Sequence, residues 1–176
     1  MPSTLIYYFF SYFVVSVILS LFFVPLMRPL SFKVGAIDTG KGRRIHAGIV
    51  PRLGGIGILL AFLIPMVFSL TRGVWDDFHG KMVGILLATA IIALIGTYDD
   101  IKGARIGIKL IGEILAALII YAWGINITVI SNPFGDPISL GWMGLPVTVL
   151  WIIIVTNAVN LIDGMDGLAA GTGVFI

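Results

Sequence analysis

Two adjacent carboxylates, Asp99 and Asp100, end a long apolar stretch and could do chemistry there. Neighbouring carboxylates at a membrane border repel each other and lose hydration, so they persist most easily beside a divalent cation or a positive partner. One carboxylate on a magnesium ion and one accepting a proton would suit phosphoryl transfer. The alternative is a solvated helix end, which is how we interpret the same dipeptide at Asp76 and Asp77.

A second group combines two amides and two carboxylates at the end of another apolar stretch. Its members follow one another at every third position, which keeps neighbours on one slowly drifting face of a helix. Gly164 and Gly167 let the backbone turn there and let a ligand approach closely. The alternative is a polar helix end and an ordinary turn, but polar residues at membrane depth are candidates for function. The four residues are Asn157, Asn160, Asp163 and Asp166.

A basic segment at residues 41–55 supplies the third group. Cations and a histidine precede the glycine pair Gly54–Gly55, which opens the next apolar stretch. Exposed N–H groups at the start of a helix favour anions, so this segment suits phosphate binding. The alternative is a plain signal of membrane orientation, which needs no ligand. The candidate phosphate-binding residues are Arg43, Arg44, His46 and Arg52.

Lys109 and Glu113 stand four residues apart near the start of a further apolar stretch. On a helix this spacing makes them neighbours. They form either an ion pair at a helix end or a support for Asp99 and Asp100, and both interpretations stay open.

The composition requires that these groups be carried by membrane-spanning elements. Of 176 residues, 59% are hydrophobic and 11% are charged, whereas a soluble domain carries roughly 25% charged residues. A soluble fold of this size is excluded because it has too little interior to bury so much apolar surface. The lack of cysteine excludes disulfides and thiolate metal sites, and two histidines cannot form a multi-histidine metal site.

Spanning helices need about 20 mostly apolar residues, and the sequence predicts an all-α, polytopic transmembrane bundle in a single integral-membrane domain, 1–176. The spacing predicts a short external β-hairpin within 126–142, where alternating residues are split by turn residues. A sixth apolar run begins at 168 and is too short to span, so we expect the chain to be the N-terminal part of a longer protein. The predicted spans are 4–27, 53–70, 82–98, 106–125 and 143–162.

The basic residues predict the orientation, because lysine and arginine accumulate on the cytoplasmic side. Six lie within 28–52 and three within 99–109, whereas two lie within 71–81 and none within 126–142. The N-terminus is therefore expected outside, and all three polar groups are expected on the cytoplasmic face of a cell membrane.

The three groups together carry a resemblance to a known family. The sequence resembles the polyprenyl-phosphate N-acetylhexosamine-1-phosphate transferases, the family of MraY, WecA and TagO. The resemblance rests on residues 43–46, 51–55 and 98–100, on Lys109, and on the long motif at 157–168. The form Pro-Arg-Leu-Gly-Gly at 51–55 is more similar to the N-acetylglucosamine-1-phosphate branch, because the muramoyl-pentapeptide branch usually shows Pro-Thr-Met-Gly-Gly.

The resemblance implies transfer of N-acetylhexosamine 1-phosphate from a UDP-sugar to a polyprenyl (undecaprenyl) phosphate, with release of UMP. This would be the first membrane step of a cell-envelope polysaccharide such as lipopolysaccharide or teichoic acid. The resemblance implies Mg²⁺, with Mn²⁺ as a substitute, held by the catalytic carboxylates. Those are Asp99, Asp100, Asp163 and Asp166. It implies that Arg43, Arg44, His46, Arg52, Lys109, Asn157 and Asn160 contact substrates.

One departure from the family concerns Glu113, which stands where the family often has glutamine. Because the family's later cytoplasmic loops fall after Ile176, we expect the 176 residues alone to be inactive.

We expect no nucleic-acid partner and leave a homodimer open. The alternative functions are a transporter or ion pathway with carboxylate relays, or a non-catalytic membrane subunit.

Overall fold

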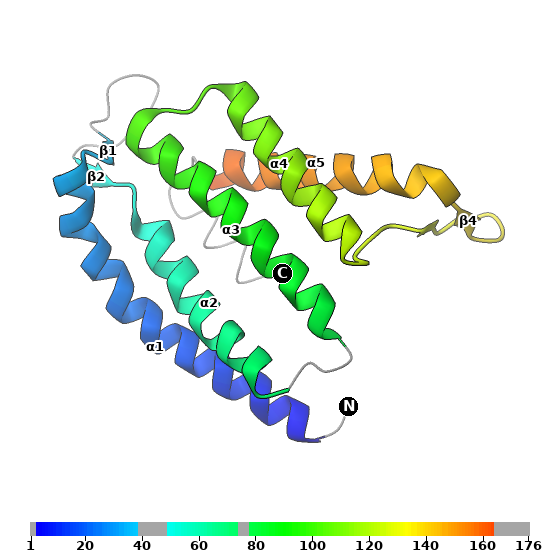
Figure 1. Cartoon of the computed structure of the whole chain (residues 1–176), viewed down its shortest axis with the longest axis horizontal. Coiled ribbons are helices and arrows are strands. Elements are labelled where there is room, and N and C mark those ends of the chain that lie inside the picture. Colours follow the sequence, from blue (N-terminus) through cyan, green and yellow to red (C-terminus); the bar gives the residue numbers. More distant parts are fainter. Residues whose placement is uncertain (1–2, 39–48, 74–77, 164–176) are drawn as a thin grey trace. The chain divides into compact units, whose positions relative to one another are not determined.

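The computed structural model describes residues 3–38, 49–73 and 78–163, which form five α-helices and two short antiparallel strand pairs (Figure 1). The helices are α1 (Ser3–Val34), α2 (Gly54–Thr71), α3 (His79–Lys102), α4 (Ile106–Ala122) and α5 (Gly144–Asp163). The strand pairs are β1 (Ile37–Asp38) with β2 (Val50–Pro51), and β3 (Val129–Ile130) with β4 (Ile138–Ser139). A 3₁₀ turn, η2 (Gly141–Met143), leads into α5. The predicted all-α class is confirmed.

The surface of these helices is suited to lipid. Large apolar side chains are exposed, including Leu94 and Leu161 at 72% and 77%, while the buried residues of the helices are mostly small. Small residues at helix contacts are typical of packing in membranes, where close backbone approach replaces a hydrophobic core. Four described segments are long and apolar enough to cross a membrane: Ile6–Val34, Gly54–Thr71, His79–Lys102 and Gly141–Ile162. The protein is a multi-pass membrane protein.

The predicted helix ends need corrections at three helices, and one of them is α3, which was expected over 82–98 but runs over His79–Lys102. The first helix was expected to end at 27, but α1 continues to Val34 with Pro25 and Pro29 inside it. It ends at Gly35, whose φ of +77° suits glycine, and the Ala36 N–H then donates to the Ser31 carbonyl at 2.9 Å. The fourth helix was expected to reach 125, but α4 ends at Ala122, two residues before Gly124 with φ +81°. The predicted sixth helix lies outside the described residues.

The chain groups into two compact units, of which the first comprises residues 1–82 and 93–105. In this unit α2 packs along α1 through small or compact residues at every fourth position. A Cβ atom added to Gly57 would lie only 2.9 Å from the backbone of Val24, so the glycine allows the two helices to approach closely. These buried residues of α2 are Gly57, Ala61, Pro65 and Ser69.

The joint between α1 and α2 is fixed by hydrogen bonds from buried groups. Ser31 is fully buried; its hydroxyl donates to the Met27 carbonyl and accepts from the N–H of Leu53, at 2.9 and 3.2 Å. Beside it, β1 and β2 pair so that Asp38 lies opposite Val50. The chain before residue 39 and the chain after residue 48 are therefore held together at this end of the unit.

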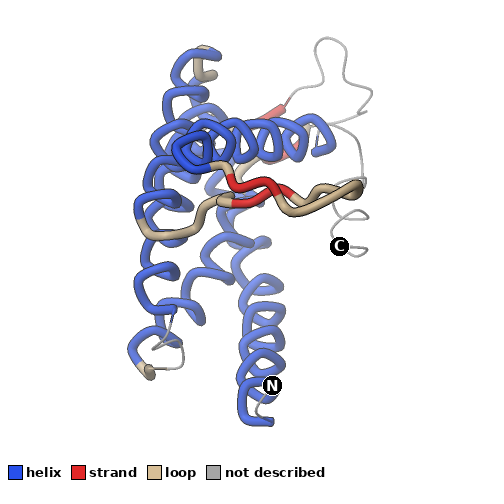
Figure 2. Tube along the Cα trace, turned by 90° about the vertical axis from the view of Figure 1, so that its right-hand side faces the viewer, coloured by secondary structure: helices blue, strands red, loops and turns tan. Residues whose placement is uncertain are grey.

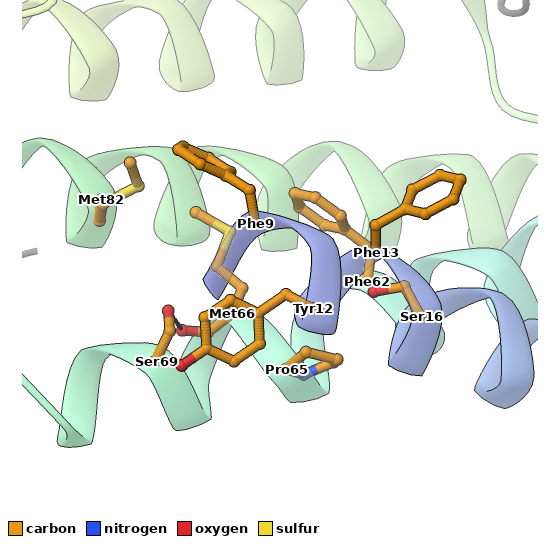
Figure 3. Close-up of a pocket in the computed structure, with 9 residues that line it drawn as sticks. All are labelled: Phe9, Tyr12, Phe13, Ser16, Phe62, Pro65, Met66, Ser69 and Met82. Atoms are coloured by element: carbon orange, nitrogen blue, oxygen red, sulfur yellow. Dashed lines mark hydrogen bonds between the residues drawn. The ribbon is translucent and has the colours of Figure 1, made fainter. Parts of the chain in front are cut away.

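A cavity of about 370 Å³ lies at the opposite end of the α1–α2 pair, because it is lined by early residues of α1 and late residues of α2 (Figure 3). Its walls are mostly aromatic and aliphatic, with Phe9, Phe13 and Phe62 among them. None of the predicted site residues whose side chains the structure describes lines it.

The second unit comprises residues 83–92 and those from 106 onward. Here α4 packs against α5, and Gly84 of α3 leaves room for the side chain of Trp123. The predicted hairpin is confirmed, since β3 pairs with β4 in the register Val129 to Ser139 (Figure 2). Thr148 joins the hairpin to α5, because its hydroxyl accepts from the N–H of Ile127 at 2.9 Å. The single integral-membrane domain stays a prediction.

Candidate functional site

The carboxylate pair lies in the last turn of α3, as the sequence predicted. Asp99 also terminates the helix: its Oδ1 accepts from the Ala104 N–H at 2.8 Å, and its carbonyl accepts from the Gly103 N–H at 2.8 Å. Gly103 has φ +72°, which lets the chain leave the helix at this point. Both carboxylates are half-buried. The carboxylate of Asp99 is thus oriented by a backbone hydrogen bond, and it is partly exposed to its surroundings.

Arg52 is the one predicted residue of the basic segment whose side chain is described. It is half-buried, and its backbone N–H donates to the Ala36 carbonyl at 3.0 Å, beside the β1–β2 pair. Within the first unit, this pair and the last turn of α3 lie at the same end (Figure 1). Arg52 and the carboxylate pair are therefore on one side of that unit. The predicted residues Arg43, Arg44 and His46 lie outside the described residues.

The polar group of the second unit begins inside α5, in the last two turns of that helix. Asn157 and Asn160 are exposed, one helical turn apart, and Asp163 is the last residue of the helix. The side chain of Asp163 and the whole of Asp166 lie outside the described part of the chain. The helical spacing that the sequence predicted is confirmed for the first three residues.

The sequence did not predict one contact of the site, a hydrogen bond between a side chain of α4 and a side chain of α5. The amide Nδ2 of Asn157 donates to Oε2 of Glu113 at 2.7 Å and to the carbonyl of Ile153 at 2.9 Å. Glu113 is half-buried and is the only acidic residue of α4. Lys109 lies one turn before it and is also half-buried. A lone carboxylate within an apolar helix was the available signal, because such a group needs a partner at membrane depth.

The fit of a magnesium ion rests on the carboxylate pair. Within residues 3–38, 49–73 and 78–163, no three His, Asp or Glu side chains gather in a way that could hold a metal. Asp99 and Asp100 offer oxygen atoms, which are the ligands Mg²⁺ prefers, and this ion usually takes only one or two carboxylates beside waters and phosphates. The described residues therefore fit a metal ion that takes one or two protein carboxylates and completes its coordination with other oxygen ligands.

Three relatives of the chain are named as transferases. It is 36% identical over 163 residues to a Bacillus subtilis protein named "Probable undecaprenyl-phosphate N-acetylglucosaminyl 1-phosphate transferase", covering 92% of this chain and 44% of the relative. It is 32% identical over 173 residues to the phospho-N-acetylmuramoyl-pentapeptide-transferase of Halalkalibacterium halodurans, covering 92% and 53%. It is 31% identical over 168 residues to the decaprenyl-phosphate N-acetylglucosaminephosphotransferase of Mycobacterium tuberculosis, covering 89% and 40%.

The chain spans about half the length of these relatives or slightly less. No solved structure matches it. The model of the family described as "Glycosyl transferase family 4" matches residues 82–176, which include the carboxylate pair, the Glu113–Asn157 contact and the polar end of α5. Since this match covers more than half of the chain, the protein belongs to glycosyl transferase family 4.

Proposed function

We propose that the whole protein transfers N-acetylglucosamine 1-phosphate from its UDP derivative to a polyprenyl phosphate in the membrane and releases UMP. The observation that carries the proposal is the likeness to a protein named as a probable undecaprenyl-phosphate N-acetylglucosaminyl 1-phosphate transferase along 92% of the chain. The relatives reported above are named as transferases, so a transporter or ion pathway gains no support from them.

The reaction exchanges one phosphoanhydride bond for another. An oxygen of the lipid phosphate attacks the β-phosphorus of the UDP-sugar and forms a new P–O bond. The P–O bond between that phosphorus and the bridging oxygen breaks, and its electron pair leaves on UMP. The lipid then carries a diphosphate linked to the sugar. Because the lipid phosphate is already largely ionised near neutral pH, the step does not require a general base.

The residues of this chain would supply binding and charge neutralisation for that step. Asp99 and Asp100 would hold Mg²⁺, or Mn²⁺ in its place, and Asp163 and Asp166 would complete the site beside the nucleotide. Bound in this way, the ion neutralises negative charge that develops on the phosphates. The hydrogen bond from Ala104 to Asp99 fixes one carboxylate before substrate arrives, so less ordering is left to the moment of reaction.

The cations and amides would bind the two substrates. Phosphate oxygens accept strong, charge-assisted hydrogen bonds from arginine and lysine, which suits Arg52 and Lys109. The same role is proposed for Arg43, Arg44 and His46, while Asn157 and Asn160 would contact the nucleotide sugar. The lipid-linked sugar would be the first intermediate of a cell-envelope polysaccharide such as teichoic acid or lipopolysaccharide. If the protein forms a homodimer, each copy would carry its own substrate-binding site.

The donor test uses membranes that contain the whole protein. With undecaprenyl phosphate and UDP-N-acetylglucosamine we expect a lipid-linked N-acetylglucosamine, and the UDP-muramoyl-pentapeptide should give at least tenfold less product. We expect this preference because Arg52 belongs to the motif Pro-Arg-Leu-Gly-Gly, which is more similar to the N-acetylglucosamine-1-phosphate branch of the family than to the muramoyl-pentapeptide branch. A clear preference for the muramoyl-pentapeptide would overturn the proposed donor. Membranes that lack the protein serve as the control.

The proposed orientation places the N-terminus outside and the site on the cytoplasmic face of the cell membrane. It rests on nine basic residues on one side against two on the other. Reporter fusions after Arg44 and after Lys102 should read as cytoplasmic, and a fusion near Asp136 in the β3–β4 hairpin should read as external. A cytoplasmic reading at Asp136 would contradict the proposed orientation, because the three polar groups would then no longer lie on the same face of the membrane.

A further inference from the structure

We propose that Glu113 is a positioning residue: it holds the side chain of Asn157 so that the amide oxygen of Asn157, and not its N–H groups, meets the UDP-sugar. The inference rests on the proposed function and adds a residue and a binding mode to it. It starts from a side chain–side chain hydrogen bond that joins α4 to α5, between groups 44 positions apart.

The contact fixes which way the Asn157 amide faces. A primary amide has two N–H donors, and here one donates to Oε2 of Glu113 and the other to the carbonyl of Ile153. Both partners are acceptors. Turning the amide over would place its oxygen against two other oxygens, so the contact specifies one orientation. The oxygen Oδ1 is then the part of Asn157 that remains to meet a ligand, and the residue is exposed.

The contact also lies where it can act on the rest of the polar group. Glu113 follows the first residue of α4 by seven positions, and Asn157 precedes the last residue of α5 by six. At about 1.5 Å per residue, each lies roughly 10 Å inside its helix. One turn outward from this point come Lys109 on α4 and Asn160 on α5. Glu113 therefore contacts α5 at the point where its polar face begins.

The orientation restricts what Asn157 can recognise. An amide oxygen accepts hydrogen bonds from O–H and N–H groups. A UDP-N-acetylhexosamine carries such donors on its uracil, ribose and sugar, whereas the oxygens of its ionised diphosphate only accept. Asn157 thus selects the nucleoside or sugar part of the donor, and contact with the diphosphate falls to cations such as Lys109.

A double-mutant cycle in the whole protein tests this. Glu113→Ala should raise KM for UDP-N-acetylglucosamine about tenfold and change kcat by less than about threefold, and Asn157→Ala should do the same. Because Glu113 acts through Asn157, the double variant should be no worse than Asn157→Ala within about twofold. Additive effects, about a hundredfold in KM, would overturn the proposal. So would a fall in kcat at constant KM.

Conservative and control variants separate positioning from folding. Glu113→Gln keeps an acceptor oxygen at the same reach, so its KM should stay within about threefold of the wild-type value; a loss equal to that of Glu113→Ala would contradict the proposal. Glu113→Met replaces Glu113→Ala if the latter does not accumulate. Thr156→Val, which removes a polar group at the adjacent position of α5, should leave KM unchanged. Thermal unfolding of each variant checks that the fold is retained.

Three further readouts assign the hydrogen-bond donor. If it lies on the nucleoside, the inhibition constant of UMP should rise together with KM in Glu113→Ala; if it lies on the sugar, only KM should rise. A rise in the Mg²⁺ concentration needed for activity, with neither of these changes, would mean that Asn157 meets the metal, and would overturn the proposal. Calorimetric titration with UDP-N-acetylglucosamine runs the same cycle without turnover. Wild-type binding without transfer would therefore refute the proposed function and still test the inference.

Discussion

Loss of single negative charges at the carboxylate positions is expected to abolish most activity. Each of four Asp→Asn substitutions removes a charge and keeps most of the side-chain shape. We expect at least two of them to lower activity about a hundredfold or more, since each 1.36 kcal/mol of barrier is roughly tenfold in rate. The assay is lipid-linked sugar formation per amount of inserted protein. The positions are Asp99, Asp100, Asp163 and Asp166.

Asp99→Asn is the most informative of the four. The amide oxygen of asparagine can still accept the N–H of Ala104, so the termination of α3 should survive. A loss of activity with normal insertion would then report on charge. Asp76→Asn and Asp77→Asn are matched controls on the predicted outer side and should change activity by less than about threefold, because surface substitutions typically shift stability by only about 0.5 kcal/mol. The proposed site would be refuted if Asp76 and Asp77 proved essential for activity while the four carboxylates of the site proved dispensable.

Removal of divalent cations is expected to have the other large effect. Membranes with the whole protein should lose nearly all lipid-linked sugar formation in excess chelator. The reason is that Asp99 and Asp100 would then face the two phosphate groups without a neutralising ion. Added Mg²⁺ or Mn²⁺ should restore the rate. Synthesis that continues undiminished in excess chelator would exclude a metal-dependent reaction and leave the carboxylate pair without its proposed role.

The helix ends were predictable where a change in composition marks them, and they were misplaced where the helix runs on to a glycine. The start of α2 was placed within one residue of Gly54, because an apolar stretch begins there. The end of α1 was misplaced by seven residues, since Arg28 was taken as the edge of the helix while the chain stays helical up to Gly35. Charges can lie in the last turns of a long helix, so a charge alone is a weaker boundary signal than a glycine.

The site was predictable as a set of residues but not as a set of contacts. The placement of Asp99 in the last turn of α3 and the helical spacing of Asn157 and Asn160 follow from local periodicity alone. The bond from Asn157 to Glu113 depends on how α4 and α5 pack, which no local pattern encodes. The sequence therefore paired Glu113 with Lys109, or with the support of Asp99 and Asp100, and did not indicate Asn157 as its partner.

The measurement that tests the central claim most directly follows the β-phosphate of the donor. The whole protein is incubated with undecaprenyl phosphate and UDP-N-acetylglucosamine labelled at the β-phosphorus, and lipid and water phases are separated. Transfer of the sugar 1-phosphate predicts that the label moves into the lipid phase while unlabelled UMP appears in water in equal amount. Label that stays in water as UDP, with sugar on the lipid, would mean transfer of the sugar alone and would contradict the account.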